Sequence, residues 1–345
     1  MFFTAVVALT TVLGPSPGLR TVHLPPPPMV IFPAESPPAI DGTAWMIWSV
    51  EGDAELGSLN PDFLTAPASI TKLMTAMLVV ERAAMTNQVR VSANADATPI
   101  GYVGQPDVRQ GEIWTVQELL ANILVQSGND AAVALAEHVS GDVERFVALM
   151  NQKAAALGMT NTTFLNPNGL DTTGHLSTAR DLILMGRAAL AYPEILRTSR
   201  IKYISFDVGG RHLVVEATNR DLGLFPGLFG LKTGDTASAR QVLLAYDEAQ
   251  HGRFLAVVLG SRNRRSATRE LLAWARTTLG PRDYFFAAAA GTDLALEFPD
   301  WYVVRLAAVG SLPAGGGMPP PRTPLTDSID GALTDLLPGI LGGRG

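Results

Sequence analysis

The chain has 345 residues, 47% hydrophobic and 17% charged, which suits one large domain with additions, or two domains, and not a disordered protein. Its 26 basic and 32 acidic residues leave a net charge of −6, and the only dense basic stretch is four arginines within residues 262–269, so no nucleic-acid partner is expected. The lack of cysteine excludes disulfides, thiolate metal sites and a cysteine nucleophile.

The first 20 residues resemble a secretory signal. Their apolar run, residues 2–13, is too short to span a bilayer, which takes about 20 residues, and it ends at a Gly/Pro-rich break. No Lys or Arg precedes the run, so the signal is either incomplete or begins upstream. Residues 21–41 are rich in proline and predict an extended linker. We therefore expect an exported, extracytoplasmic protein.

The first half of the compact region predicts one hairpin followed by helices. Alternation over residues 44–49 before Gly52-Asp53 indicates a strand and a tight turn. Residues 70–84 are apolar on nearly every side, which is typical of a helix buried on all faces. Thr115 and Glu118 form a capping box for the next helix. The remaining expected helices cover residues 115–126, 130–138, 142–157 and 177–191, the last capped by Ser177.

The second half changes to strands. Residues 201–208 and 211–217 flank Gly209-Gly210, a strong hairpin signal. Three more strands are expected at 228–233, 241–246 and 254–260, then a closing helix at 267–279. Residues 281–345 predict a short extension with a strand near 301–307, a Gly/Pro-rich linker and an apolar tail. The tail could be a weak membrane anchor through Ile329, Leu333, Leu336, Leu337, Ile340 and Leu341, although three aspartates beside them disfavour an anionic surface.

The candidate base for a nucleophile is lysine. None of the five histidines pairs with another at metal-ligand spacing and no Gly-x-Ser-x-Gly occurs, so neither a metal site nor a Ser-His-Asp triad is expected. The chain has only four lysines beside 22 arginines. Arginine cannot lose its proton in a protein, whereas a buried lysine can.

Two Ser-x-x-Lys pairs are present, Ser69/Lys72 and Ser199/Lys202. The second leads into a strand pattern, where residues three apart point to opposite faces. The first opens the buried helix, where residues three apart share a face, burial lowers the lysine pKa, and backbone N–H groups could stabilise an oxyanion. The alternative, a capping serine with a lysine that reaches solvent, fits an almost wholly apolar helix less well.

Two further motifs follow. Ser127-Gly128-Asn129 interrupts a helical stretch, so its polar side chains could turn into a cleft. Lys232-Thr233-Gly234 falls in a predicted strand, where glycine allows close approach of a ligand and the lysine and threonine could hold a carboxylate. For this tripeptide alone, a solvated lysine on an edge strand is the alternative.

The three motifs together resemble the penicillin-recognising serine enzymes, and their surroundings resemble the low-molecular-weight D-alanyl-D-alanine carboxypeptidases (serine peptidase family S11). The similar segments, within roughly residues 42–280, are Ala66–Ala76, Ser127–Ala132, Leu157–Thr160, Asn166–Leu170, Thr218–Arg220 and Gly230–Gly234. The resemblance implies an α+β fold, an α/β sandwich of the β-lactamase/transpeptidase type. In it, an antiparallel sheet is flanked by helices, a helical lobe is inserted, and the active site lies between the two.

The resemblance also implies roles for residues of the three motifs. Ser69 would attack the carbonyl of a terminal D-Ala-D-Ala bond with Lys72 as general base, and no metal or other cofactor would take part. The other implied roles are proton relay by Ser127, substrate binding by Asn129, Lys232, Thr233 and Gly234, and an oxyanion hole made by the backbone N–H groups of Ser69 and Asp235. The implied partners are the peptidoglycan stem peptide and, as covalent inhibitors, β-lactams.

Two rival functions and one departure accompany this interpretation. A class A β-lactamase would need a deacylating glutamate in Glu-x-x-Leu-Asn, and none of Glu137, Glu144, Glu194 and Glu216 lies in such a sequence. A wall-peptide receptor that acylates poorly is the second rival.

The departure is Asp235, where the family is expected to carry an aromatic residue or histidine. Its carboxylate would repel the substrate's own carboxylate unless Arg264 or Arg265 neutralises it.

Overall fold

The computed structural model describes residues 36–101, 107–249, 252–278, 283–288 and 303–308. The described residues fall into two compact units, and the larger contains those of residues 36–278. Strands β10 (Asp283–Ala288) and β11 (Val303–Ala308) pair in a sheet of their own, and β11 overlaps the strand predicted at 301–307. The signal-like segment and the apolar tail lie outside the described residues. Within the described ranges, no helix is long and apolar enough to cross a membrane.

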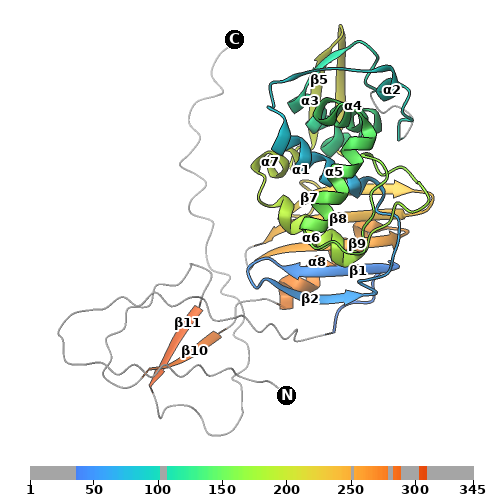
Figure 1. The fold of residues 1–345 in the computed structure, drawn as a ribbon. Coiled ribbons are helices and arrows are strands. Elements are labelled where there is room, and N and C mark those ends of the chain that lie inside the picture. The colour runs from blue at the N-terminus through green and yellow to red at the C-terminus, as the bar shows by residue number, and fades with distance from the viewer. Residues whose placement is uncertain (1–35, 102–106, 250–251, 279–282, 289–302, 309–345) are drawn as a thin grey trace, which may run out of the picture. The chain divides into compact units, whose positions relative to one another are not determined.

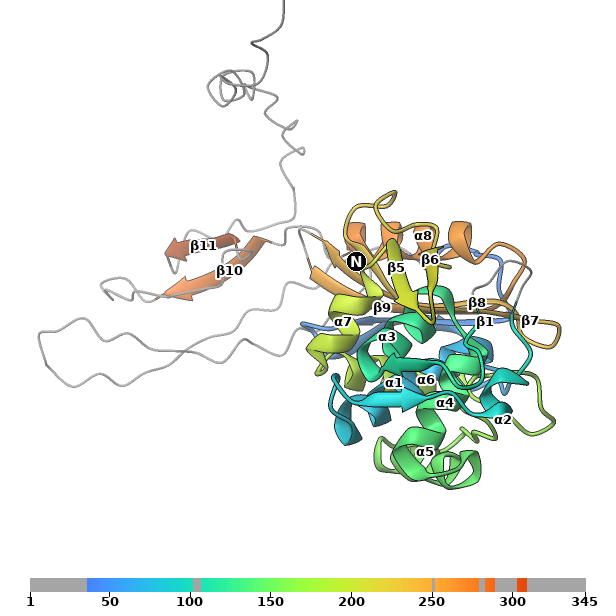
Figure 2. The ribbon, with the colours of Figure 1, turned by 90° about the horizontal axis from the view of Figure 1, so that it is seen from above.

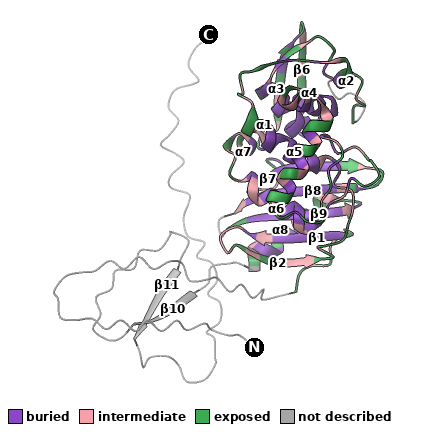
Figure 3. Ribbon diagram, viewed as in Figure 1, coloured by how far each residue is buried: buried purple, intermediate pink, exposed green. Residues whose placement is uncertain are grey.

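A five-stranded antiparallel sheet forms the base of the larger unit (Figure 1). In the order β2-β1-β9-β8-β7, its strands are Ala54–Leu59, Ala44–Ser49, Gly252–Ser261, Arg240–Ala249 and Leu228–Thr236. The predicted strands at 44–49, 228–233, 241–246 and 254–260 are therefore confirmed. β9 lies between β1 and β8 and is almost wholly buried (Figure 3), whereas β7 lies at the sheet edge.

Helices cover both faces of the sheet (Figure 2). Because successive side chains of a strand point to opposite faces, β9 sends Ala256 to one layer and Val257 to the other. The first layer packs against α8 (Arg264–Thr278), through residues such as Leu271. The second packs against α6 (Ala179–Ala189) and joins the main core.

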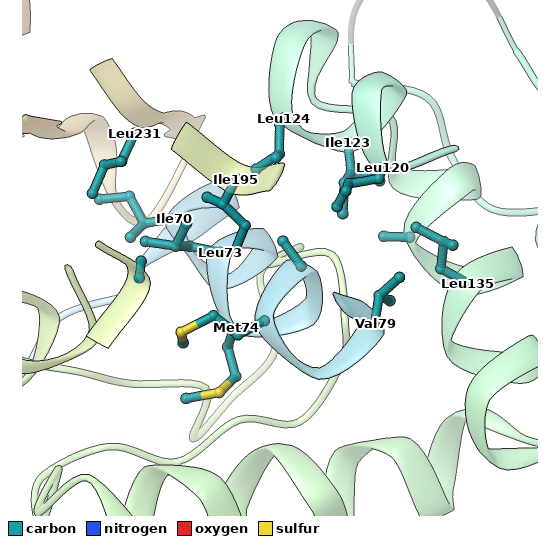
Figure 4. Packing of buried hydrophobic residues seen from close by; sticks show 14 of the residues in the cluster. Ile70, Leu73, Met74, Val79, Leu120, Ile123, Leu124, Leu135, Ile195 and Leu231 are labelled. Carbon is teal, nitrogen blue, oxygen red and sulfur yellow. The ribbon is translucent and has the colours of Figure 1, made fainter. Parts of the chain in front are cut away.

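The helical lobe is built around α1 (Thr71–Arg82), whose residues 71–79 are all buried. Figure 4 shows its apolar side chains among those of neighbouring helices. Those neighbours are α3 (Val116–Ala121), the π-helical turn η2 (Asn122–Gln126), α4 (Asn129–Ser140), α5 (Val143–Ala156) and α7 (Pro193–Ser199). The remaining elements are α2 (Ala93–Asp96) and two hairpins, β3 (Gln88–Arg90) with β4 (Ile113–Thr115) and β5 (Tyr203–Val208) with β6 (Arg211–Glu216).

Two details of the predicted helix boundaries can be compared with the structure. The capping box of Thr115 and Glu118 is confirmed. The predicted cap at Ser177 is wrong, because the cap is Thr178, whose side chain accepts from the Asp181 N–H. Ser177 exchanges two backbone hydrogen bonds with Thr65 instead, so the helix can begin only one residue later.

Candidate active site

Ser69 and Lys72 lie at the entrance to α1. Ser69 lies in η1 (Ala68–Ile70), one turn of 3₁₀ helix that continues directly into α1. The Lys72 amine nitrogen is 2.8 Å from the Ser69 hydroxyl. Ala68 has a φ of 47°, a left-handed conformation that is uncommon for a residue with a side chain. Such strain is often found at functional sites. The predicted helical spacing thus brings a half-buried serine onto a fully buried lysine.

Lys72 has two other acceptors, Asn129 Oδ1 at 2.7 Å and the Asn168 backbone oxygen at 2.5 Å. Burial lowers the pKa of Lys72 to about 7, while the charge of Asp130 acts in the opposite direction. The neutral amine keeps two hydrogens, which the two asparagine oxygens accept, and its lone pair can take the Ser69 proton. The contacts therefore suit a general base at neutral pH.

Asp130, whose charge acts on this lysine, is itself buried. Its carboxylate accepts the backbone N–H groups of Val108 and Ala131. Burial raises the pKa of Asp130, and these hydrogen bonds act to lower it.

Ser127 lies where the predicted helix of residues 115–126 turns sharply. The chain leaves α3, passes through η2 and reaches Ser127 with φ at 73°. The N–H groups of Ser127 and Gly128 both donate to the Asn122 carbonyl. A Cβ on Gly128 would lie 1.9 Å from Asn122 Oδ1, so this turn requires glycine. In the part of the chain that the structure describes, the Ser127 hydroxyl makes no hydrogen bond, whereas Asn129 Nδ2 donates to Pro99 O.

Lys232 is buried on β7, with 2% of its surface exposed, and donates to the Thr233 carbonyl at 2.9 Å. The alternative of a solvated edge-strand lysine is therefore wrong, because η1 and α7 pack against this edge strand and Lys232 is buried. Burial lowers the pKa of Lys232, and the cations Lys72 and Arg264 lower it further. The Thr233 hydroxyl is 2.6 Å from the hydroxyl of Thr218.

Gly234 allows β7 to lie against the nucleophile turn. A Cβ at this position would be 2.9 Å from the Ser69 nitrogen and 2.8 Å from the Ala68 Cβ. Asp235 follows, with 60% of its side chain exposed, and its carboxylate is 3.7 Å from Arg264 Nη1. Of Arg264 and Arg265, the two arginines predicted as possible partners, only Arg264 lies near the Asp235 carboxylate.

Several residues around the site were not assigned a role from the sequence. The Asn168 carbonyl bonds Lys72, and a Cβ on the next residue, Gly169, would lie 1.9 Å from the Ala68 oxygen. Both belong to the segment Asn166–Leu170, which resembles the family but for which the sequence predicts no role. Arg265, the second arginine considered, pairs with the buried Asp221. In the described ranges, no cluster of three or more His, Asp or Glu residues could hold a metal ion.

Residues 32–263 match the family model described as D-alanyl-D-alanine carboxypeptidase, peptidase family S11. The chain belongs to this family. The match spans all three motifs, so the family resemblance drawn from the sequence is confirmed.

Relatives in the family have the same description. The carboxypeptidase DacF of Bacillus subtilis is 39% identical over 59% of this chain and 53% of its own length. DacC of Escherichia coli is 34% identical over 69% of this chain and 62% of its own length. The chain therefore spans between about half and two thirds of these two curated relatives.

Penicillin-binding protein D2 of Listeria monocytogenes, solved in an ampicillin-bound form, superposes with a TM-score of 0.60 at 30% identity, covering 68% of this chain and 97% of that one. This likeness and the observed antiparallel sheet between helices confirm the predicted α+β class.

Proposed function

We propose that the protein is a serine D-Ala-D-Ala carboxypeptidase that removes the terminal D-Ala from peptidoglycan stem pentapeptides through an acyl-enzyme on Ser69. One observation carries the proposal: a fully buried Lys72 with a pKa of about 7 contacts the Ser69 hydroxyl at 2.8 Å. The family to which the chain belongs supports the choice of substrate. The catalytic domain is proposed to cover residues 42–280.

Acylation proceeds by attack of Ser69 Oγ on the carbonyl carbon between the two D-Ala residues, with transfer of the hydroxyl proton to Lys72 Nζ. The oxyanion that forms accepts from the backbone N–H groups of Ser69 and Asp235. Collapse of the intermediate breaks the C–N bond, and the proton passes through Ser127 to the leaving amine. Water then hydrolyses the ester, with Lys72 again taking the proton.

The terminal carboxylate binds beside β7. Lys232 and Thr233 line this edge, Gly234 leaves room for the substrate, and Asn129 holds the peptide on the other side. A carboxylate near Lys232 restores the charged form of this buried lysine, because an opposite charge favours the ammonium. Asp235 opposes anion binding only partly, because Arg264 lies 3.7 Å from its carboxylate.

The same serine is proposed to react with β-lactams, as the ampicillin-bound form of the Listeria relative suggests. The stem peptide lies outside the cytoplasmic membrane, so the protein would act in the cell envelope after export through a signal within residues 1–20. The apolar C-terminal tail would add a weak membrane contact at most.

The proposal is tested by labelling with fluorescent penicillin, mass spectrometry of the labelled peptide, and D-Ala release from a pentapeptide ending in D-Ala-D-Ala. We expect label on Ser69 and loss of both label and D-Ala release in Ser69→Ala. Ser199→Ala, from the other Ser-x-x-Lys pair, is the matched control and should keep both activities. Stable label without D-Ala release would identify a receptor, and rapid turnover of the label a β-lactamase.

A further inference from the structure

Arg264 begins α8 and reaches the strand that carries Lys232 and Gly234. Its Nη1 donates to the Gly234 carbonyl at 2.9 Å, and only 17% of its side chain is exposed. Burial lowers the pKa of Arg264 from its ordinary value, with Asp235 acting in the other direction. A guanidinium held this far from water needs acceptors, and of its two acceptors among the described residues the nearer is a backbone oxygen.

The acceptor belongs to a particular peptide unit. The Gly234 carbonyl and the Asp235 N–H are parts of one planar trans peptide, so they point in opposite directions. Arg264 Nη1 lies on the carbonyl side of this peptide, so the Asp235 N–H points away from Arg264. The same peptide lies beside the nucleophile turn, because a Cβ on Gly234 would be only 2.9 Å from the Ser69 nitrogen.

We infer that Arg264 is a positioning residue for the oxyanion hole: by holding the Gly234 carbonyl it fixes, and polarises, the peptide whose N–H is the proposed oxyanion donor of Asp235. A charged donor on the carbonyl draws electron density through the amide and makes its N–H a better donor. Arg264 acts through this peptide and does not touch the reacting atoms. The inference rests on the proposed function.

A different role for a cation near this site is direct binding of the substrate carboxylate, and the two roles predict different kinetics. A carboxylate-binding arginine would mainly raise KM, and it would not matter to a ligand without a carboxylate. An arginine that positions the oxyanion donor would lower kcat and would matter to any ligand that forms an oxyanion on Ser69.

The test compares wild type, Arg264→Gln and Arg264→Lys with two probes. The first is benzeneboronic acid, which has no carboxylate and forms a tetrahedral anion on the nucleophilic serine. The second is a D-Ala-D-Ala peptide, for kcat and KM. Loss of a direct oxyanion donor costs roughly 100- to 1000-fold in kcat, so loss of its support should cost about 10- to 100-fold. We expect Arg264→Gln to lose this much in kcat and at least about tenfold in boronate affinity, with KM changed less than about threefold.

Arg264→Lys keeps the charge, so its kcat and boronate affinity should fall between those of wild type and Arg264→Gln. This variant gives a second measurement if Arg264→Gln folds poorly. Arg265→Gln is the matched control, because the neighbouring arginine pairs with Asp221 instead, and it should keep wild-type boronate affinity. Unchanged boronate affinity and kcat in both Arg264 variants, or a rise confined to KM, would overturn the inference. Wild-type protein that neither acylates nor releases D-Ala would instead remove the proposed function, and the inference with it.

Discussion

Replacing Lys72 by methionine should change how stability depends on pH, because methionine has a similar volume and no charge. The pKa of Lys72 is lowered by burial from 10.5 to about 7 in the folded protein. In the unfolded chain the ordinary value applies. Between these two values the unfolded chain binds more protons than the folded one, so the free energy of unfolding of the wild type rises with pH. Below pH 7 the full cost of charging the buried amine is present, and above 10.5 none of it is.

The magnitude follows from this shift. The cost of charging the buried Lys72 amine is about 5 kcal/mol in all, at about 1.4 kcal/mol per pKa unit. Between pH 7 and pH 9 the wild type should gain about 2 kcal/mol relative to Lys72→Met, because at pH 7 half of the lysines are already neutral. The lost hydrogen bonds to Asn129 and Asn168 add an offset, but the offset does not vary with pH. Lys232 is present in both proteins. Without the Lys72 charge the pKa of Lys232 is higher in the variant, so the variant's free energy of unfolding rises less with pH and the gap to the wild type grows.

Urea unfolding at pH 7, 8 and 9 measures this difference directly. Lys202→Met, which removes a lysine far along the chain from the site, controls for the general effect of losing one lysine. If the gap between wild type and Lys72→Met stays within about 0.5 kcal/mol over this range, the folded-state pKa of Lys72 is not near 7. The assignment of Lys72 as the base would then lose its electrostatic support.

Lys72→Arg should slow penicillin acylation by about 10²–10⁴ despite the retained charge, because a guanidinium is not a base at neutral pH; a rate within tenfold of wild type would contradict this. The acylation rate of the wild type should rise with pH through a midpoint near 7, and a flat profile from pH 6 to 8 would exclude Lys72 as the titrating base. Gly234→Ala should lose at least about 100-fold in acylation rate, because its Cβ would lie 2.9 Å from the Ser69 nitrogen; near-wild-type labelling would show that β7 can move. Asp235→Asn should change KM for a D-Ala-D-Ala peptide less than about twofold, because Arg264 already lies 3.7 Å from the carboxylate, and a fall above about fivefold at low salt would show that the carboxylate is effectively unpaired.

The parts of the fold that the sequence predicted have strong local patterns. The strands of the main sheet alternate or are apolar over six or more residues, and the α3 boundary has a capping box. The short hairpin of β3 and β4 cannot be predicted in this way, because three-residue strands are too short to show a period. The cap at Thr178 was misplaced by one residue because Ser177 is an equally good capping type. Only the bridge between Ser177 and Thr65, which are far apart in sequence, decides between them.

The candidate site also has contacts that the sequence can predict and contacts that it cannot. Ser69 and Lys72 are three residues apart on one helix entrance, so their contact follows from helical geometry. The Asn168 carbonyl could not be found from residue types, because every residue carries a backbone oxygen. Nor could the sequence choose between Arg264 and Arg265, since a helix rotates about 100° per residue and sends adjacent side chains to different partners.

The three basic side chains Lys72, Lys232 and Arg264 link the proposed recognition and catalysis through one balance of charge. Burial, Lys72 and Arg264 all lower the pKa of Lys232, so its ammonium form is disfavoured unless a negative charge lies close by. In the proposed mechanism, a substrate carboxylate would supply this negative charge and stabilise the Lys232 ammonium. That ammonium in turn keeps Lys72 neutral, because two buried like charges repel, and the neutral amine is the form that can accept the Ser69 proton. A ligand without a carboxylate would leave Lys232 without an opposite charge. The carboxylate that marks a chain terminus would therefore also favour the neutral, reactive form of Lys72.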